Sequence, residues 1–173
     1  MLRLISIVVS CIIVLLVLAF PCQASIVSSY QATDDFDKIF FDMVADYELF
    51  TSLCQDVYPF QQYNLALHAT NPDTANAYLS TGFSPDLAQA ISTCYLQWLP
   101  EIDKIAIIPT DSIPVITNED RGCLNMRRIS PDEIIMERIY SDCYIIGDRY
   151  LYSITARRSS SRWIICGLKL EPL

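Results

Sequence analysis

Residues 133–170 read EIIMERIYSDCYIIGDRYLYSITARRSSSRWIICGLKL, and this stretch decides the fold. β-Branched and aromatic residues alternate with polar ones along it, which is typical of strands with one buried face. Ile146-Gly147-Asp148 and Ser159-Ser160-Ser161 interrupt the alternation, and Ser130-Pro131-Asp132 precedes it. Because these connections are short, neighbouring strands should pair as antiparallel hairpins. We expect four strands, at residues 122–129, 133–145, 149–158 and 162–170.

The half of the chain before these strands has the apolar spacing of helices. Thr33 or Asp34 can cap a first helix, and Pro59 sets its end because the residue before a proline avoids helical geometry. Ser84-Pro85-Asp86 has the form of a cap, a first-turn proline and an acid that suits the helix dipole. We expect helices over residues 34–57, about 73–80 and about 85–97.

The remaining segments fit around these elements. Residues 58–71 have the character of a connector, and residues 105–108 and 113–117 that of short strands, which prolines confine to sheet edges. Helices followed by strands predict an α+β fold. We expect two to three N-terminal helices packed on a curved antiparallel meander sheet of four to six strands.

The amino terminus has the layout of a secretory signal. Arg3 supplies a positive charge, residues 4–20 are apolar except for two serines, and Pro21 ends the run. Small residues at Cys22 and Ala24 predict cleavage after Ala24, so residues 1–24 are the signal peptide and residues 25–173 a single secreted, extracytoplasmic domain. Membrane attachment is expected only if this segment stays uncleaved.

Composition excludes several classes of function. The 173 residues are 52% hydrophobic, which is too apolar for a disordered tail, and the net charge of −8 argues against nucleic-acid binding. After cleavage, residues 25–120 hold 14 acidic and 2 basic residues, and residues 121–173 hold 6 acidic and 9 basic ones. This contrast has two interpretations: complementary charge between two layers of one domain, or a basic sheet face open to an anionic partner.

Five cysteines remain after cleavage, and an odd number leaves at least one thiol unpaired in any disulfide scheme. Cys54 and Cys94 both fall in expected helices and could join them. The alternative is that all five are small buried hydrophobes. The five are Cys54, Cys94, Cys123, Cys143 and Cys166.

Strand parity gives the sharpest hypothesis about a site. Three-residue turns place even-numbered residues of the last three strands on one face, including Ile164 and Cys166, with Arg138 opposite Ala156. In one interpretation Arg138, Tyr140 and Tyr152 line a cavity and bind a carboxylate or a similar small anion. In the other, Arg138 pairs with a helix acid such as Asp42 or Asp46, or a bulge turns it to solvent.

The sequence offers little for catalysis. His68 is the only histidine, and a pair with Cys54 or Cys94, oriented by Asp73, has no support in the spacing. Nucleotide-binding loops and zinc signatures are absent from the sequence. We therefore predict no catalytic residue, no metal site and no cofactor.

Amino-terminal helices, an antiparallel meander and a closing strand with Arg162-Trp163-Ile164-Ile165 resemble the cystatin-like superfold, which includes the nuclear transport factor family. The resemblance covers about residues 33–170 and carries over no functional residue. Small secreted bacterial proteins of this shape include inhibitors of cell-wall endopeptidases. The resemblance thus implies a non-catalytic, inhibitor-like protein that binds an extracytoplasmic or cell-envelope protein through its sheet and the 109–121 loop. The alternative is a small-ligand binder or modest hydrolase with a cavity around Arg138.

Overall fold

The computed structural model describes residues 21–109, 113–142 and 145–173, with side chains from residue 35 onward. It divides into two units, residues 1–38 and residues 39–173. Most of the predicted signal peptide lies outside the described residues, so cleavage after Ala24 stays a prediction. Among the helices described, none is long and apolar enough to span a bilayer.

Helix α2 (Pro21–Gln55) begins earlier than predicted. The expected start at residue 34, with Thr33 or Asp34 as cap, is wrong, because residues 22–33 contain neither glycine nor proline to interrupt a helix. Pro21 occupies the first turn, where proline is tolerated. The expected apolar face is confirmed between residues 39 and 53, and its buried members are Ile39, Phe40, Met43, Val44, Tyr47, Phe50 and Leu53.

A first sheet, which the sequence analysis missed, follows α2. Its antiparallel strands have the order β1-β2-β4-β3. The hairpin lies in the segment expected to be a connector, and its turn has Gln61 at φ 53°, without the glycine or asparagine that marks most such turns. Pro59 is compatible with β1 because β1 is an edge strand. The strands are β1 (Val57–Phe60), β2 (Tyr63–Ala66), β3 (Leu96–Leu99) and β4 (Lys104–Ile107).

Two short helices, α3 (Pro72–Leu79) and α4 (Pro85–Tyr95), connect β2 to β3. Ser84 is the predicted cap, since its hydroxyl accepts a hydrogen bond from the Leu87 N–H. The prediction that the helix corresponding to α4 reaches Gln97 is wrong, because the backbone becomes extended at Leu96 and enters β3. The buried face of α4 is Ala88, Ile91 and Ser92, so Cys94 is exposed.

Two predicted edge strands turn out differently. The strand expected at residues 105–108 corresponds to β4, which lies inside the sheet between β2 and β3. Pro109 falls beyond the end of β4. The described part of the second, residues 113–117, forms no strand. A 3-10 helix, η1 (Asn118–Cys123), follows it and occupies the start of the expected strand at 122–129.

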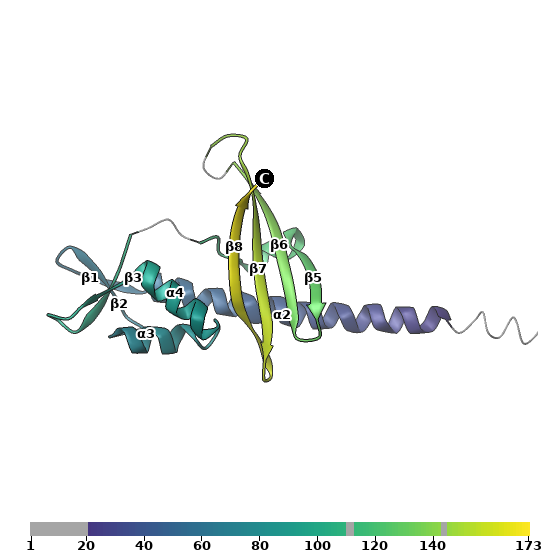
Figure 1. Ribbon diagram of the computed structural model, residues 1–173, viewed down its shortest axis with the longest axis horizontal. Coiled ribbons are helices and arrows are strands. Elements are labelled where there is room, and N and C mark those ends of the chain that lie inside the picture. The colour runs from purple at the N-terminus through teal and green to yellow at the C-terminus, as the bar shows by residue number, and fades with distance from the viewer. Residues whose placement is uncertain (1–20, 110–112, 143–144) are drawn as a thin grey trace, which may run out of the picture. The chain divides into compact units, whose positions relative to one another are not determined.

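The second sheet is the predicted meander. Consecutive strands pair antiparallel in the order β5-β6-β7-β8, and they lie side by side in Figure 1. The α+β class is therefore confirmed. Arg138 pairs with Tyr152 and not with Ala156, because β6 ends at Ser141 and the β6–β7 connection is longer than three residues. The strands are β5 (Asn125–Ser130), β6 (Glu133–Ser141), β7 (Arg149–Ser159) and β8 (Arg162–Pro172).

A β-bulge reverses the faces at the start of β8. The register shifts between Thr155 and Ala156, so Ala156 pairs with Ile165. The prediction that Ile164 and Cys166 share the inner face is consequently wrong, and Trp163 and Ile165 are the buried residues. A one-residue slip exchanges the two faces of a strand, and a bulge produces that slip locally.

The segment before α4 extends the second sheet by one bridge. Ser84 donates its N–H to the Ile165 carbonyl at 2.8 Å, and the Ile165 N–H donates to the Gly82 carbonyl at 2.9 Å. Phe83 and Ile165 thus form a parallel bridge at the edge of β8. This contact covers part of an edge that would otherwise offer free backbone groups.

Gly82→Ala should destabilise the protein. A Cβ at this buried position would lie 2.5 Å from Asp46 Oδ1 and 2.8 Å from Leu49 Cδ1, and both distances are shorter than a van der Waals contact. We expect the free energy of unfolding in urea to fall by about 1–3 kcal/mol. Gly122→Ala is the matched control, because a Cβ there meets nothing within 4 Å. Equal stability of the two variants would contradict the close packing of residue 82 on α2.

Candidate functional site

Arg138, Tyr140 and Tyr152, the residues predicted to bind a ligand, lie together on one face of the second sheet. Arg138 and Tyr152 are register partners, and the Arg138 guanidinium carbon lies 4.4 Å from the centre of the Tyr140 ring. The rings of Tyr140 and Tyr152 are 6.2 Å apart, edge to face. A guanidinium over a tyrosine ring is an attractive arrangement. The group that pairs with Arg138 then determines what this cluster can bind.

That group is Asp120, which the sequence analysis did not offer as a partner for Arg138. Arg138 Nη1 donates to Asp120 Oδ1 in an ion pair. The other oxygen, Oδ2, accepts from the Thr117 N–H at 2.8 Å and the Thr117 hydroxyl at 3.1 Å, which caps η1. Both carboxylate oxygens are thus engaged, and a carboxylate of the chain itself neutralises the guanidinium. The expectation that Asp42 or Asp46 would pair with Arg138 is wrong.

Tyr152 is held by a second tyrosine. Its hydroxyl lies 2.6 Å from that of Tyr47 on α2, and both side chains are almost fully buried. Burial raises the pKa of Tyr47 and the pKa of Tyr152 well above the usual range, because phenolate is poorly solvated there. Both phenols stay protonated at neutral pH, and the pair joins helix to sheet.

Asp42 and Asp46, one helical turn apart, bind the start of β8. Asp42 Oδ2 accepts from the Trp163 N–H at 3.0 Å, and Asp46 Oδ1 accepts from Arg162 Nη2. Arg162 Nη1 also donates to the Thr81 carbonyl at 2.6 Å. Asp46 is fully buried, and this burial raises its pKa to about 8 even though Arg162 lowers it.

Three hollows are described, and other residues line them. One of about 240 Å³ lies between α2 and residues 115–118, and a second of about 240 Å³ lies between the end of α2, Tyr95 and residues 107–109. A third of about 180 Å³ lies among α3, α4 and the first sheet. Arg138, Tyr140 and Tyr152 line none of these three hollows.

His68 has a different partner from those considered in the sequence. Its Nε2 lies 2.7 Å from Asp56 Oδ2, and its ring stacks on Tyr78 at 5.2 Å between centres. The contacts described for His68 do not include Cys54, Cys94 or Asp73. Burial raises the pKa of the Cys54 thiol to about 11, so it is protonated and not activated as a nucleophile.

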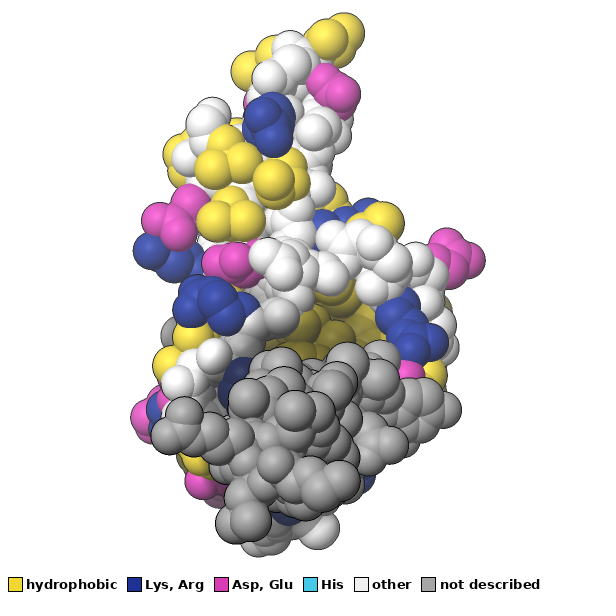
Figure 2. All heavy atoms as spheres, turned by 90° about the vertical axis from the view of Figure 1, so that its right-hand side faces the viewer, with side chains coloured by type: hydrophobic (Ala, Val, Ile, Leu, Met, Phe, Trp, Pro, Cys, Tyr) yellow, Lys and Arg dark blue, Asp and Glu magenta, His cyan; other side chains and the backbone are white. Residues whose placement is uncertain are grey.

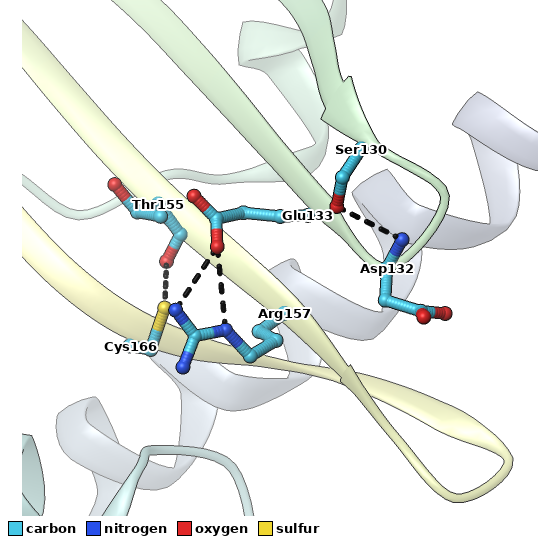
Figure 3. A network of polar contacts seen from close by, with 6 residues as sticks. All are labelled: Ser130, Asp132, Glu133, Thr155, Arg157 and Cys166. Atoms are coloured by element: carbon cyan, nitrogen blue, oxygen red, sulfur yellow. Dashed lines mark hydrogen bonds and ion pairs between the residues drawn. The ribbon is translucent and has the colours of Figure 1, made fainter.

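A second thiol lies in a polar network on the outer face of the second sheet (Figure 3). Arg157 Nη2 donates to Glu133 Oε2 at 2.9 Å across β6 and β7, and Cys166 Sγ donates to the Thr155 carbonyl at 3.4 Å. Burial raises the pKa of Cys166 more than Arg157 lowers it. Cys54, Cys94, Cys123 and Cys166 are all free, so the proposed link between Cys54 and Cys94 is not formed. Cys143 lies outside the described residues.

The connection between β6 and β7 carries the most exposed apolar side chains of the described chain. Ile145 is 74% exposed and Ile146 is 95% exposed, and we call this pair the apolar tip. Hydrophobic side chains stand at the top of Figure 2, which is the end where Figure 1 shows this loop. Ile139, two positions before the last residue of β6 that pairs with β7, adds a half-exposed side chain at the same end.

Hydrogen bonds order the described part of the loop, Asp142 and residues 145–148, around the apolar tip. The Asp142 N–H donates to the Asp148 carbonyl at 3.0 Å, and the Gly147 N–H donates to Asp142 Oδ1 at 2.6 Å. Ile145 donates its N–H to Asp148 Oδ2 at 3.0 Å. Gly147 has φ 91°, a conformation that glycine adopts without strain. The two isoleucines are therefore presented outward by a hydrogen-bonded turn.

Comparisons with known proteins add no family. No protein-family model matches the chain, and no curated protein is significantly similar to it. Within the part of the chain that the structure describes, no three His, Cys, Asp or Glu side chains are grouped so as to hold a metal ion.

The raised pKa of Asp46 predicts a pH-dependent stability. Because folding raises this pKa from 3.8 to about 8, the folded protein keeps a proton that the unfolded chain releases. The contribution of Asp46 to stability is complete below about pH 4 and is lost as the pH rises through about 8. Urea unfolding of the wild type and Asp46→Asn across this range should show the fall only in the wild type. Parallel curves would contradict the assignment.

The pairing of Arg138 with Asp120 predicts coupled effects of substitution. Arg138→Gln leaves a carboxylate that is only 11% exposed without its partner, and should lower the free energy of unfolding by about 1–3 kcal/mol. Adding Asp120→Asn should cost less than the sum of the two single effects, as chemical denaturation of all four proteins would measure. Strict additivity would show that the ion pair does not contribute.

Proposed function

We propose that this protein is a secreted, non-catalytic binding protein that engages an extracytoplasmic or cell-envelope protein in an inhibitor-like manner. The observation that carries this proposal is the exposure of the apolar tip, Ile145 and Ile146, on a hydrogen-bonded turn. Exposed isoleucine side chains are hydrophobic, so burying these two neighbours against a partner would lower the free energy of the system. The expected export signal at residues 1–24 suits an extracytoplasmic partner.

The form of the apolar tip favours a protein partner with a groove. A small molecule needs a concave pocket that covers most of its surface, and the tip is a projecting turn. The turn is already ordered by its own hydrogen bonds, so less conformational entropy is lost when a partner binds it. A rigid apolar projection is suited to fill a cleft, which is the basis of the inhibitor-like proposal.

Charge around the apolar tip favours a protein over a lipid surface. Asp142 and Asp148 flank the two isoleucines, and the whole chain carries a net charge of −8. Anionic membrane surfaces attract polybasic segments and repel acidic ones. We therefore propose a partner whose groove is apolar with a neutral or basic rim.

The 109–121 loop and the cavity around Arg138 have less support. In the described part of that loop, Ile116 and Asp120 are buried, so their side chains serve the protein itself. The Arg138 guanidinium already has Asp120 as its counter-ion, and an incoming anion would have to displace it.

Replacement of the apolar tip should remove partner binding without unfolding the protein. Because both side chains are exposed, Ile145→Ser/Ile146→Ser should leave the melting temperature close to that of the wild type. Isolation with tagged protein from the culture medium and the cell envelope should recover a protein that the double variant does not retain. With the purified partner we expect binding at least about thirtyfold weaker for the double variant.

Ile129→Ser is the matched control, since Ile129 is 45% exposed on β5 and lies outside the apolar tip. It should retain the partner. The proposed function would be overturned if the wild type and both variants retained the partner equally. It would also be overturned if none of them retained any protein. Binding of the wild type to neutral or anionic vesicles in place of a protein would overturn it as well.

A further inference from the structure

We propose that the hollow between α3, α4 and the first sheet is a binding site for a single neutral sugar ring. This site is independent of the apolar tip, because it uses none of the same elements. Its volume is about 180 Å³, similar to the volume of about 150 Å³ of an apolar cavity that holds a benzene ring. A space of this size suits one small ring and is too small for a long chain of groups.

The spacing of residues on three elements builds the hollow. Ser92 lies one turn from Gln89 on the inner side of α4, and Asn76 lies one turn from Pro72 on α3. Residues two apart on a strand share a face, and so do register partners, which brings Trp98 and Ile105 to the same wall. The lining residues are Pro72, Asn76, Gln89, Ser92, Thr93, Leu96, Trp98 and Ile105.

Two polar atoms in this lining have no hydrogen-bond partner in the protein. Ser92 is 6% exposed, and its Oγ makes no hydrogen bond. Asn76 Nδ2 donates to Gln89 Oε1 at 2.8 Å, while the buried Asn76 Oδ1 accepts nothing. A buried polar group without a partner is unfavourable, so each such group in a folded protein calls for an explanation. A ligand that pairs with both atoms explains them together.

The chemistry of the lining selects a neutral ligand with hydroxyl groups. A serine hydroxyl both donates and accepts, and an amide oxygen only accepts, so the ligand must offer at least one donor. None of the eight lining residues is charged, and an ion entering the hollow would lose water without gaining a counter-charge. A hydrocarbon would leave Ser92 and Asn76 unpaired. A sugar ring offers hydroxyl groups that can pair with the polar atoms, and a face of C–H groups that can pack on Trp98 and Ile105.

The ring could be a free monosaccharide or the end of a glycan. Gln89 and Thr93 are exposed at the edge of the hollow, so a chain attached to the ring could continue into solvent. Both sources present the same ring chemistry to Ser92 and Asn76. Measurement with free sugars and with linear oligosaccharides of the same units distinguishes them.

Saturation-transfer NMR on the full chain tests the proposal, with D-glucose, D-galactose and N-acetyl-D-glucosamine as probes and gluconate as a charged counterpart. We expect saturation transfer to at least one neutral sugar and none to gluconate. Ser92→Ala should weaken sugar binding by about five- to tenfold. The same substitution should leave the melting temperature unchanged or raise it, because it removes a hydroxyl that has no partner in the protein.

Ser80→Ala is the control, since Ser80 is exposed at the end of α3 and does not line the hollow. It should bind sugar like the wild type. Tighter binding of a trisaccharide than of its single unit would indicate a glycan end, and equal binding a free sugar. No transfer to any neutral sugar at tens of millimolar, equal transfer to gluconate, or unchanged binding by Ser92→Ala would overturn the proposal. These results are separable from the proposed function, because Ile145→Ser/Ile146→Ser should retain sugar binding.

Discussion

The contact between Asp46 and Arg162 is the one on which the packing of the second unit depends. Arg162 reaches from the start of β8 to the fully buried carboxyl group of Asp46 on α2 and, with its other nitrogen, to the Thr81 carbonyl. A buried carboxyl group that loses its hydrogen-bond partner is unfavourable in either protonation state, so the three segments are constrained to meet. Gly82 follows from the same constraint, because any side chain at that position would collide with Asp46.

This constraint also accounts for the uneven charge of the sequence. Acidic residues gather in the first part of the chain and basic residues in the second, and the structure pairs members of the two groups across layers. Asp46 contacts Arg162, and Asp120 contacts Arg138. The residues of each pair are distant in the sequence and come together only in the folded protein. These pairs favour complementary charge between layers over an open basic face. They also leave Arg138 with an internal counter-ion, which an outside anion would have to displace.

Sequence reasoning succeeded where structure follows from local pattern. The four strands of the second sheet have alternating residues and clear turns, and the Ser84 cap has a mechanism that acts within one helical turn. It failed where a long-range or unmarked feature decided the outcome. The β1–β2 hairpin turns at Gln61 without a glycine, and the bulge opposite Ala156 reverses Trp163 and Cys166. Asp120 could have been noticed, because Thr117 three residues before it has the spacing of a capping box.

Among the described residues, two places outside the charged contacts depart from ordinary packing. The Asp120 and Tyr47 clusters are closed by partners within the protein, whereas Asp46 Oδ2 is buried without a hydrogen-bond partner. Closed polar clusters stabilise without needing a ligand. The apolar tip and the hollow beside Ser92 are of the opposite kind, since one exposes hydrocarbon and the other buries polar atoms that the protein does not pair. Natural sequences leave apolar side chains exposed or buried polar groups unpaired mainly at functional sites, because selection for folding alone would remove such unfavourable features. We propose that an outside molecule supplies, at each of these two places, the contact that folding leaves unmade.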